Sequence, residues 1–208
     1  MAWFSRFTRF GDMHWVFGQE RNISCGVACI IMAAFKINKF TPGVQASFSE
    51  DDVLSRATVL MGPNPLGTDG LSNPQMVTLL NDPMFNMGGW RLDTLPQTSV
   101  PNSIITQVGV ASGFGPTLDV KPVIVGIDWI GGKGHWVLID TVRTFMGSTY
   151  ATVCDPQDAN VHVTELATNS TFNYTGQRIW GRELWGKPIG YDAPNVGGAF
   201  IGDIISRP

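Results

Sequence analysis

The sequence predicts an α+β fold, in which a helical N-terminal part packs on an antiparallel β-sheet. The run from Cys25 to Ile37 is apolar on nearly all of its faces, which is typical of a helix buried in a core. From residue 121 onward the pattern changes to short strand-like runs separated by turns. With 208 residues, 43% hydrophobic and 15% charged, we expect one domain over residues 1–208, helical over about 19–120 and β-sheet over about 121–208.

Helix signals recur between the first helix and the sheet. Ser24 is a suitable N-cap for the first helix. Three further helices are expected around residues 49–60, 74–82 and 102–109. The stretch 41–120 carries no recognisable catalytic motif.

Strand signals fill the next part of the chain. Strands are expected at residues 122–130, 135–142, 149–156 and 160–166, with the sequence GGKG at 131–134 as the turn between the first two. They follow one another closely, which favours antiparallel hairpins. The tail 169–208 has no clear period and is expected to wrap the sheet.

Charge and hydropathy exclude several classes of function. The net charge is -3, the pI is near 5.5, and the 14 Lys and Arg residues are scattered, so there is no basic stripe for nucleic acid. No apolar run approaches the 18 or more residues of a membrane span, and the N-terminus lacks the apolar stretch of a signal peptide. We expect a soluble protein that stays in the cytoplasm or leaves it by a route independent of signal peptides.

Three cysteines are too few, and of the wrong parity, for a disulfide framework. Cys25 is expected at the first position of the buried helix, where unpaired N–H groups and the helix dipole favour a thiolate. Cys29 lies one turn further in, where an apolar surrounding keeps a thiol protonated and inert. Cys25 is therefore the candidate nucleophile.

A histidine and a carboxylate are expected to accompany this thiol. If the strands at 135–142 and 149–156 form a hairpin centred near Phe145, His135 faces Asp155, which can then fix the imidazole tautomer. Asp128 is the alternative orienting residue if the preceding hairpin is tight. Asp140 is excluded because it lies five residues along the same strand as His135, about 16 Å away.

Gln19 completes the candidate site. It precedes Cys25 by six residues, so its side-chain amide could reach the same cleft and stabilise an oxyanion together with the Cys25 backbone N–H. A thiol at a helix start, a histidine and an orienting carboxylate are the parts of a cysteine-nucleophile site.

Several segments carry a family resemblance by their order and spacing. They are Gln19, Cys25-Gly26-Val27-Ala28 with the apolar helix to Met32, Pro122 to Val125, His135-Trp136-Val137 and Asp155-Pro156. In these residues the chain resembles the papain-like cysteine peptidases, closest to the bacteriocin-processing (double-glycine) branch and related bacterial effector proteases. Ser24 stands where that branch usually has Asp, and Gly26 replaces the Trp of plant papain-type enzymes.

The resemblance implies a papain-like fold and a cysteine endopeptidase, a hydrolase that needs neither cofactor nor metal and acts on a protein or peptide substrate. Catalysis is assigned to Cys25, His135 and Asp155, with Gln19 in the oxyanion hole. Only 18 residues precede Gln19, too few for an inhibitory propeptide. We therefore expect a toxin-like effector restrained by a cognate inhibitor protein, or else a dedicated processing peptidase.

Alternatives to proteolysis stay open. A protein deamidase or transglutaminase could use the same three residues, because these reactions also pass through a thioester. A catalytically silent peptide-binding module is less compatible with an intact set. A zinc site built from Cys25, Cys29, Cys154 and His135 is disfavoured, since Cys154 should point away from Asp155 and no CxxC spacing is present.

Overall fold

The predicted α+β class is confirmed in the computed structural model. The structure describes residues 3–8, 10–111, 121–129, 134–167, 173–175, 183–184, 187–188 and 197–207. The α-helices in this part are α1 (Cys25–Asn38), α2 (Glu50–Met61), α3 (Asn73–Leu80) and α4 (Val100–Val108), with short 3₁₀ turns at Pro83–Phe85 and Gln97–Ser99. All four lie where the sequence predicted helices. No helix in the described residues is long and apolar enough to cross a membrane.

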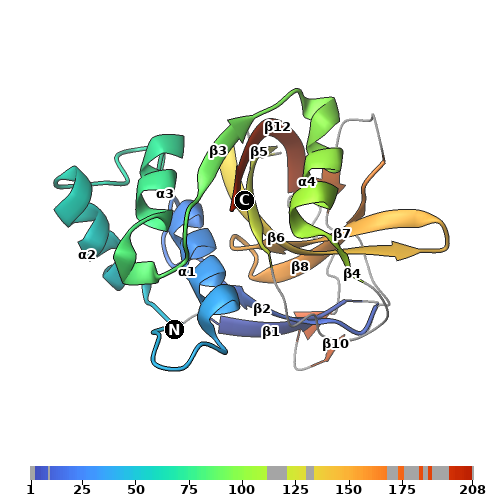
Figure 1. Ribbon diagram of the computed structural model, residues 1–208, viewed down its shortest axis with the longest axis horizontal. Coiled ribbons are helices and arrows are strands. Elements are labelled where there is room, and N and C mark those ends of the chain that lie inside the picture. The colour runs from blue at the N-terminus through green and yellow to red at the C-terminus, as the bar shows by residue number, and fades with distance from the viewer. Residues whose placement is uncertain are drawn as a thin grey trace.

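One large, mostly antiparallel sheet forms the other half of the molecule (Figure 1). Its strand order is β3-β12-β5-β6-β7-β8, with β4 parallel to β6 and β9 antiparallel to β12. The bounds are β3 (Arg91–Thr94), β4 (Val110–Ala111), β5 (Val123–Trp129), β6 (Gly134–Phe145), β7 (Ser148–Asp155), β8 (Asn160–Glu165), β9 (Asn173–Thr175) and β12 (Gly197–Ser206). Strands β5 to β8 match the four predicted strands. The predicted turn at 131–134 lies outside the described residues except for Gly134, which opens β6.

The two faces of the sheet pack on different helices. A hydrophobic core lies on each face of the sheet. Successive side chains of β5 and β6 point to opposite faces, so neighbouring residues join different cores. Ile124 and Leu138 join the core around α1, whereas Val125, Val137 and Ile139 join the core beneath α4. Figure 1 shows α1 and α4 on either side of these strands. The start of α1 is thereby held beside the sheet.

Gly26 permits the close approach of α1 to its neighbours. A Cβ at this position would lie 2.6 Å from Met76 Sδ of α3 and 3.5 Å from Trp136 Cδ1 of β6. Real Cβ atoms do not approach another heavy atom to 2.6 Å, so a larger residue here would require the Met76 side chain or α1 itself to shift. The tight packing explains why glycine follows Cys25 here.

The β6–β7 hairpin differs in register from the prediction. Its turn is Met146-Gly147, with both residues at positive φ, rather than Phe145. Thr141 pairs with Thr152 but Ile139 pairs with Val153, so Asp140 is an extra residue that forms a β-bulge.

The bulge decides which residues share a face. Without it, the register would continue with Asp155 opposite Leu138, on the other face of the sheet from His135. With it, Asp155 comes opposite Val137, two residues from His135 and on the same face. The expected direct pairing of His135 with Asp155 is wrong by two residues, yet the diagonal neighbours remain within reach.

Two further features escaped the sequence analysis. The tail does not simply wrap the sheet, because β12 lies within it between β3 and β5. The hairpin of β1 (Trp3–Phe7) and β2 (Met13–Phe17) was not expected, and Trp3 stacks on Phe35 of α1 with ring centroids 4.8 Å apart. Strands β10 (Glu183–Leu184) and β11 (Lys187–Pro188) form a separate short pair.

Candidate active site

Cys25 begins α1 and lies at a cavity between the helical part and the sheet. Ser24 occupies the N-cap position as predicted, but its side chain makes no capping hydrogen bond to the helix. Cys25 is half-buried, and the cavity has a volume of about 620 Å³. The cavity is lined by Asn22, Ile23, Cys25, Thr68, Asp69, Leu71, Asn73, Gly126, Gly134, His135, Trp136, Gln157 and Ile201. The thiol is thus accessible to a ligand.

His135 and Asp155 are in contact beside this thiol. His135 Nε2 lies 2.8 Å from Asp155 Oδ1, and the side chains are 7% and 0% exposed. The same carboxylate oxygen accepts a 2.8 Å hydrogen bond from the Gln157 backbone N–H. Because an ionised carboxylate only accepts, the N–H at Nε2 donates to Asp155, and Nδ1 is the second ring nitrogen, which this bond does not involve.

The electrostatics of the pair keep the imidazole protonated. Burial by itself lowers the pKa of His135, but the charge and hydrogen bond of Asp155, followed by a hydrogen bond and the charge of Cys25, raise that pKa from 6.5 to about 10. The raised pKa makes the imidazolium the favoured form of His135 at neutral pH.

Asp128 and Asp140 lie elsewhere. Asp128, the alternative orienting residue, stands opposite Gly134 in the β5–β6 ladder and is exposed. Asp140 is buried at the other end of α1 and contacts His14 and Lys36. Among the three candidate carboxylates, it is Asp155 that hydrogen-bonds His135.

Gln19 is close in the fold, but its amide is engaged. Its backbone N–H donates to the Pro156 carbonyl at 2.8 Å, which ties this residue to the end of β7 next to Asp155. Its side-chain Nε2 donates to the Arg21 carbonyl at 2.9 Å, and Gln19 is not among the residues that line the cavity. An oxyanion role for Gln19 requires its amide to turn toward Cys25 and stays a prediction.

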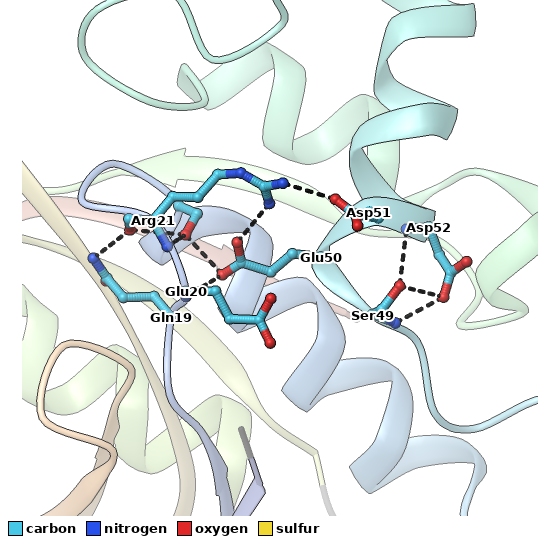
Figure 2. Close-up of polar contacts among 8 residues, drawn as sticks. Gln19, Glu20, Arg21, Ser49, Glu50, Asp51 and Asp52 are labelled. Carbon is cyan, nitrogen blue, oxygen red and sulfur yellow. Dashed lines mark hydrogen bonds and ion pairs between the residues drawn. The ribbon is translucent and has the colours of Figure 1, made fainter. Parts of the chain in front are cut away.

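Sequence reasoning missed Glu50, whose carboxylate bonds the loop of residues 19–24 that precedes Cys25 in the chain (Figure 2). This carboxylate is fully buried at the start of α2. Its Oε1 accepts hydrogen bonds from the Glu20 backbone N–H and Ser24 Oγ, each at 2.7 Å, and its Oε2 pairs with Arg21 at 2.9 Å. The motif Ser49-Glu50-Asp51-Asp52 signals only a helix start, because Ser49 and Asp52 form a capping box.

The middle of the chain also contributes to the cavity wall. No catalytic motif was recognised in residues 41–120, yet Thr68, Asp69, Leu71 and Asn73 line the cavity. Asn73 at the start of α3 also bonds Asp203 of β12 at 2.8 Å, which joins the two halves of the wall. Isolated polar residues of this kind leave no sequence signal.

The other cysteines are not placed to react. Cys29 is fully buried, and burial, then the Cys25 and Asp155 charges, raise the pKa of its thiol well above the ordinary value. Cys154 is buried too, and burial followed by the Asp140 charge raises the pKa of its thiol. The prediction that Cys29 packs in the core is confirmed.

Two clusters within the described residues bring three potential metal ligands within 4.8 Å of one another. They are His14-Asp140-Cys154 and Asp155-Asp158-His162, so neither is the cysteine-rich set that was considered. In the first cluster, the Lys36 ammonium lies 2.5 Å from Asp140 Oδ2 and supplies the positive charge that a metal ion would otherwise bring. In the second, Asp155 is already bound to His135.

Comparison with known proteins adds no family assignment. No protein-family model matches the chain, and no curated protein matches it in sequence.

Proposed function

We propose that this protein is a papain-like cysteine endopeptidase with Cys25 as nucleophile. One observation carries the proposal: the buried His135–Asp155 hydrogen bond of 2.8 Å lies beside a half-buried thiol at the start of α1, on a cavity of about 620 Å³. A histidine held protonated by a carboxylate next to an accessible sulfur has few structural uses other than activating it.

The reaction follows from the positions of these groups. The Cys25 thiolate attacks the peptide carbonyl carbon, and the negative charge moves to the carbonyl oxygen near the Cys25 backbone N–H. His135 gives its proton to the departing amine as the C–N bond breaks, leaving a thioester. Neutral His135 then takes a proton from a water that hydrolyses the thioester, and Asp155 keeps the ring oriented throughout.

The second oxyanion donor is assigned to Gln19. Its side-chain amide now binds the Arg21 carbonyl, a surface contact that a substrate oxyanion can replace at little cost. Rotation of the side chain would bring Nε2 toward the carbonyl oxygen, while the backbone stays fixed to Pro156. Catalytic hydrogen bonds are often incomplete before substrate binds.

Incubation with candidate proteins, followed by intact mass analysis, tests the proposal. We expect fragments with the wild-type chain and intact protein with Cys25→Ala, while Cys154→Ala behaves like wild type. Deamidation would instead add about one dalton per site through the same thioester chemistry, and cross-linked products would indicate transglutamination. Unchanged masses with both chains would contradict catalysis.

We further propose that the enzyme acts as a toxin-like effector, on the strength of the resemblance in its motif residues. Expression of the wild-type chain should slow the growth of a bacterial or eukaryotic host, and Cys25→Ala should relieve this. Equal growth of the two strains in both hosts would instead favour a dedicated processing peptidase with narrow specificity.

A further inference from the structure

The observation behind this inference is a buried carboxylate with three partners on one short loop. Glu50 is 0% exposed and bonds the Glu20 N–H, Ser24 Oγ and the Arg21 guanidinium. These groups lie within the 19–24 loop, which carries Gln19 at one end and leads into Cys25 at the other. Figure 2 shows Glu50 reaching from the start of α2 to this loop.

The loop is fixed from two sides. Glu50 holds its centre to α2, and the Gln19 N–H holds its beginning to the Pro156 carbonyl, directly after Asp155. A loop tied at both points has little freedom to move relative to α1 and β7. These contacts therefore set the position of the Gln19 backbone relative to Cys25, and the Gln19 side chain turns from that fixed point.

Glu50 also changes what Ser24 does. Ser24 stands at the N-cap of α1, where serine hydroxyls usually accept a bond from an N–H of the first turn. Here its Oγ lies 2.7 Å from Glu50 Oε1 and makes no capping bond. Because the carboxylate can only accept, the hydroxyl donates to it. The first N–H groups of α1 are left without a side-chain cap, next to the proposed nucleophile.

From these contacts we infer that Glu50 is a positioning residue for the oxyanion hole. It acts through the 19–24 loop: it fixes the Gln19 backbone and, together with the Arg21 backbone groups that also bond Ser24 Oγ, keeps the Ser24 hydroxyl away from the first turn of α1. It does not contact the substrate. The inference rests on the proposed function, since it concerns the same site, but it assigns a role to a residue of α2 that the three-residue mechanism does not use.

The first experiment is a double-variant cycle on peptide turnover. Glu50→Ala should lower kcat on the order of 10²-fold with little change in KM, because small displacements of catalytic groups lower the reaction rate by factors of this size. Gln19→Ala should cost a similar factor. If both act on one oxyanion hole, the double variant stays within about tenfold of Gln19→Ala. Losses that multiply to about 10⁴-fold would overturn the inference.

Alkylation separates the oxyanion hole from the nucleophile. Iodoacetamide reacts with the thiolate without forming an oxyanion, so Glu50→Ala should keep the Cys25 alkylation rate within about threefold of wild type. A fall in alkylation that matches the fall in turnover would overturn the inference, because the thiol itself would then be affected. Asp51→Asn is the matched control: Asp51 is 82% exposed and shares only Arg21, so both rates should stay unchanged.

Glu50→Gln is a milder variant, which tests the inference if Glu50→Ala does not fold. The amide oxygen can still accept from the Glu20 N–H and Ser24 Oγ, but its NH₂ group cannot accept from Arg21. Turnover by Glu50→Gln should therefore lie between those of wild type and Glu50→Ala. If Glu50→Ala fails to fold, this folded variant decides, and wild-type kcat for Glu50→Gln would overturn the inference.

Hydrogen exchange makes the test independent of any substrate. The Glu20 amide, which bonds Glu50, should exchange slowly in the wild type and in Asp51→Asn, and faster in Glu50→Ala. If the wild-type chain shows no thiol-dependent turnover, the proposed function fails while this measurement still decides the role of Glu50. Equal exchange in all three proteins would overturn it.

Discussion

The two ends of helix α1 carry similar residues in very different surroundings. At the N-terminal end Cys25 lies beside the His135–Asp155 pair, whose contact is 2.8 Å. Cys25 is half-buried and lines a cavity of about 620 Å³, and Asp155 has His135 as its charged partner. This end can accept a ligand and transfer a proton.

At the C-terminal end a second histidine–aspartate pair is buried. His14 Nδ1 lies 3.0 Å from Asp140 Oδ2, and Cys154 Sγ lies 3.8 Å from the same oxygen. Lys36 of α1 also reaches this oxygen, at 2.5 Å. Burial by itself raises the pKa of Asp140, but the His14 and Lys36 charges and hydrogen bonds hold it well below its usual range.

The comparison shows that a cysteine, a histidine and an aspartate occur together twice in this chain, in surroundings that differ in access and in charge. Burial raises the pKa of Cys154 and so favours its protonated thiol. The Lys36 ammonium forms an ion pair with Asp140, the carboxylate that would otherwise orient His14. Because Lys36 neutralises Asp140 and because His14, Asp140 and Cys154 are all buried, we interpret this second cluster as structural. Four predictions test this contrast, from the largest expected effect to the smallest.

Asp155→Asn should have the largest effect on rate. The amide cannot hold the His135 tautomer or its charge, and equivalent changes in such sites lower kcat on the order of 10⁴-fold. Asp140→Asn should alter kcat little. Steady-state turnover of both purified variants measures this, with circular dichroism as a check on folding. A greater loss of rate in Asp140→Asn than in Asp155→Asn would reverse the assignment of the two ends.

Asp140→Asn should instead have the larger effect on stability. It leaves the Lys36 ammonium, 4% exposed, without its counter-charge, and breaking a buried ion pair costs about 3–5 kcal/mol of unfolding free energy. Urea unfolding measures the loss. Asp51→Asn, which removes an exposed partner of Arg21, serves as the control and should change the free energy of unfolding very little.

Thiol reactivity should differ between the two ends. Iodoacetamide at neutral pH should modify Cys25 much faster than Cys154 or Cys29, because the latter two thiols are buried with raised pKa values. Peptide mass mapping over a time course follows each cysteine. Comparable labelling of all three in the folded protein would remove the argument for an activated Cys25.

The smallest change concerns the shape of the pH profile. The pKa of His135 is raised to about 10, so the imidazolium persists through neutral pH and is lost as the pH rises through that value. The value of kcat/KM should therefore fall as the pH rises through about 10. Asp155→Asn removes the largest influence that raises this pKa, so its residual activity should fall at lower pH. An alkaline limb that does not move would show that Asp155 leaves the His135 proton affinity unchanged.

Much of the secondary structure was predictable because its signals are local. The apolar run after Ser24 identified α1, and alternating apolar residues identified β5 to β8. The register of β6 and β7 was not predictable, since no sequence signal marked Asp140 as a bulged residue. The contact of His135 with Asp155 was still anticipated, because an error of two residues keeps both side chains on one face.

Glu50 and β12 illustrate the opposite case. A glutamate in the first turn of a helix is a favourable partner for the helix dipole, and the sequence gives no reason to expect its carboxylate to bond the loop that precedes Cys25. Likewise, the position of β12 between β3 and β5 depends on pairing partners in these two strands, which all lie at least 69 residues earlier. Long-range contacts of this kind are absent from any local pattern.

The sequence by itself determined the residue types available for chemistry and the elements that carry them: a thiol at the start of a buried helix, and a histidine and an aspartate on adjacent strands. Only the tertiary structure decided which aspartate hydrogen-bonds which histidine. That choice depends on the bulge at Asp140, which turns Asp155 toward His135, and on Lys36, which reaches Asp140 across the core. Strand alternation is a property of the chain, but register, burial and charge pairing arise only when distant segments pack together.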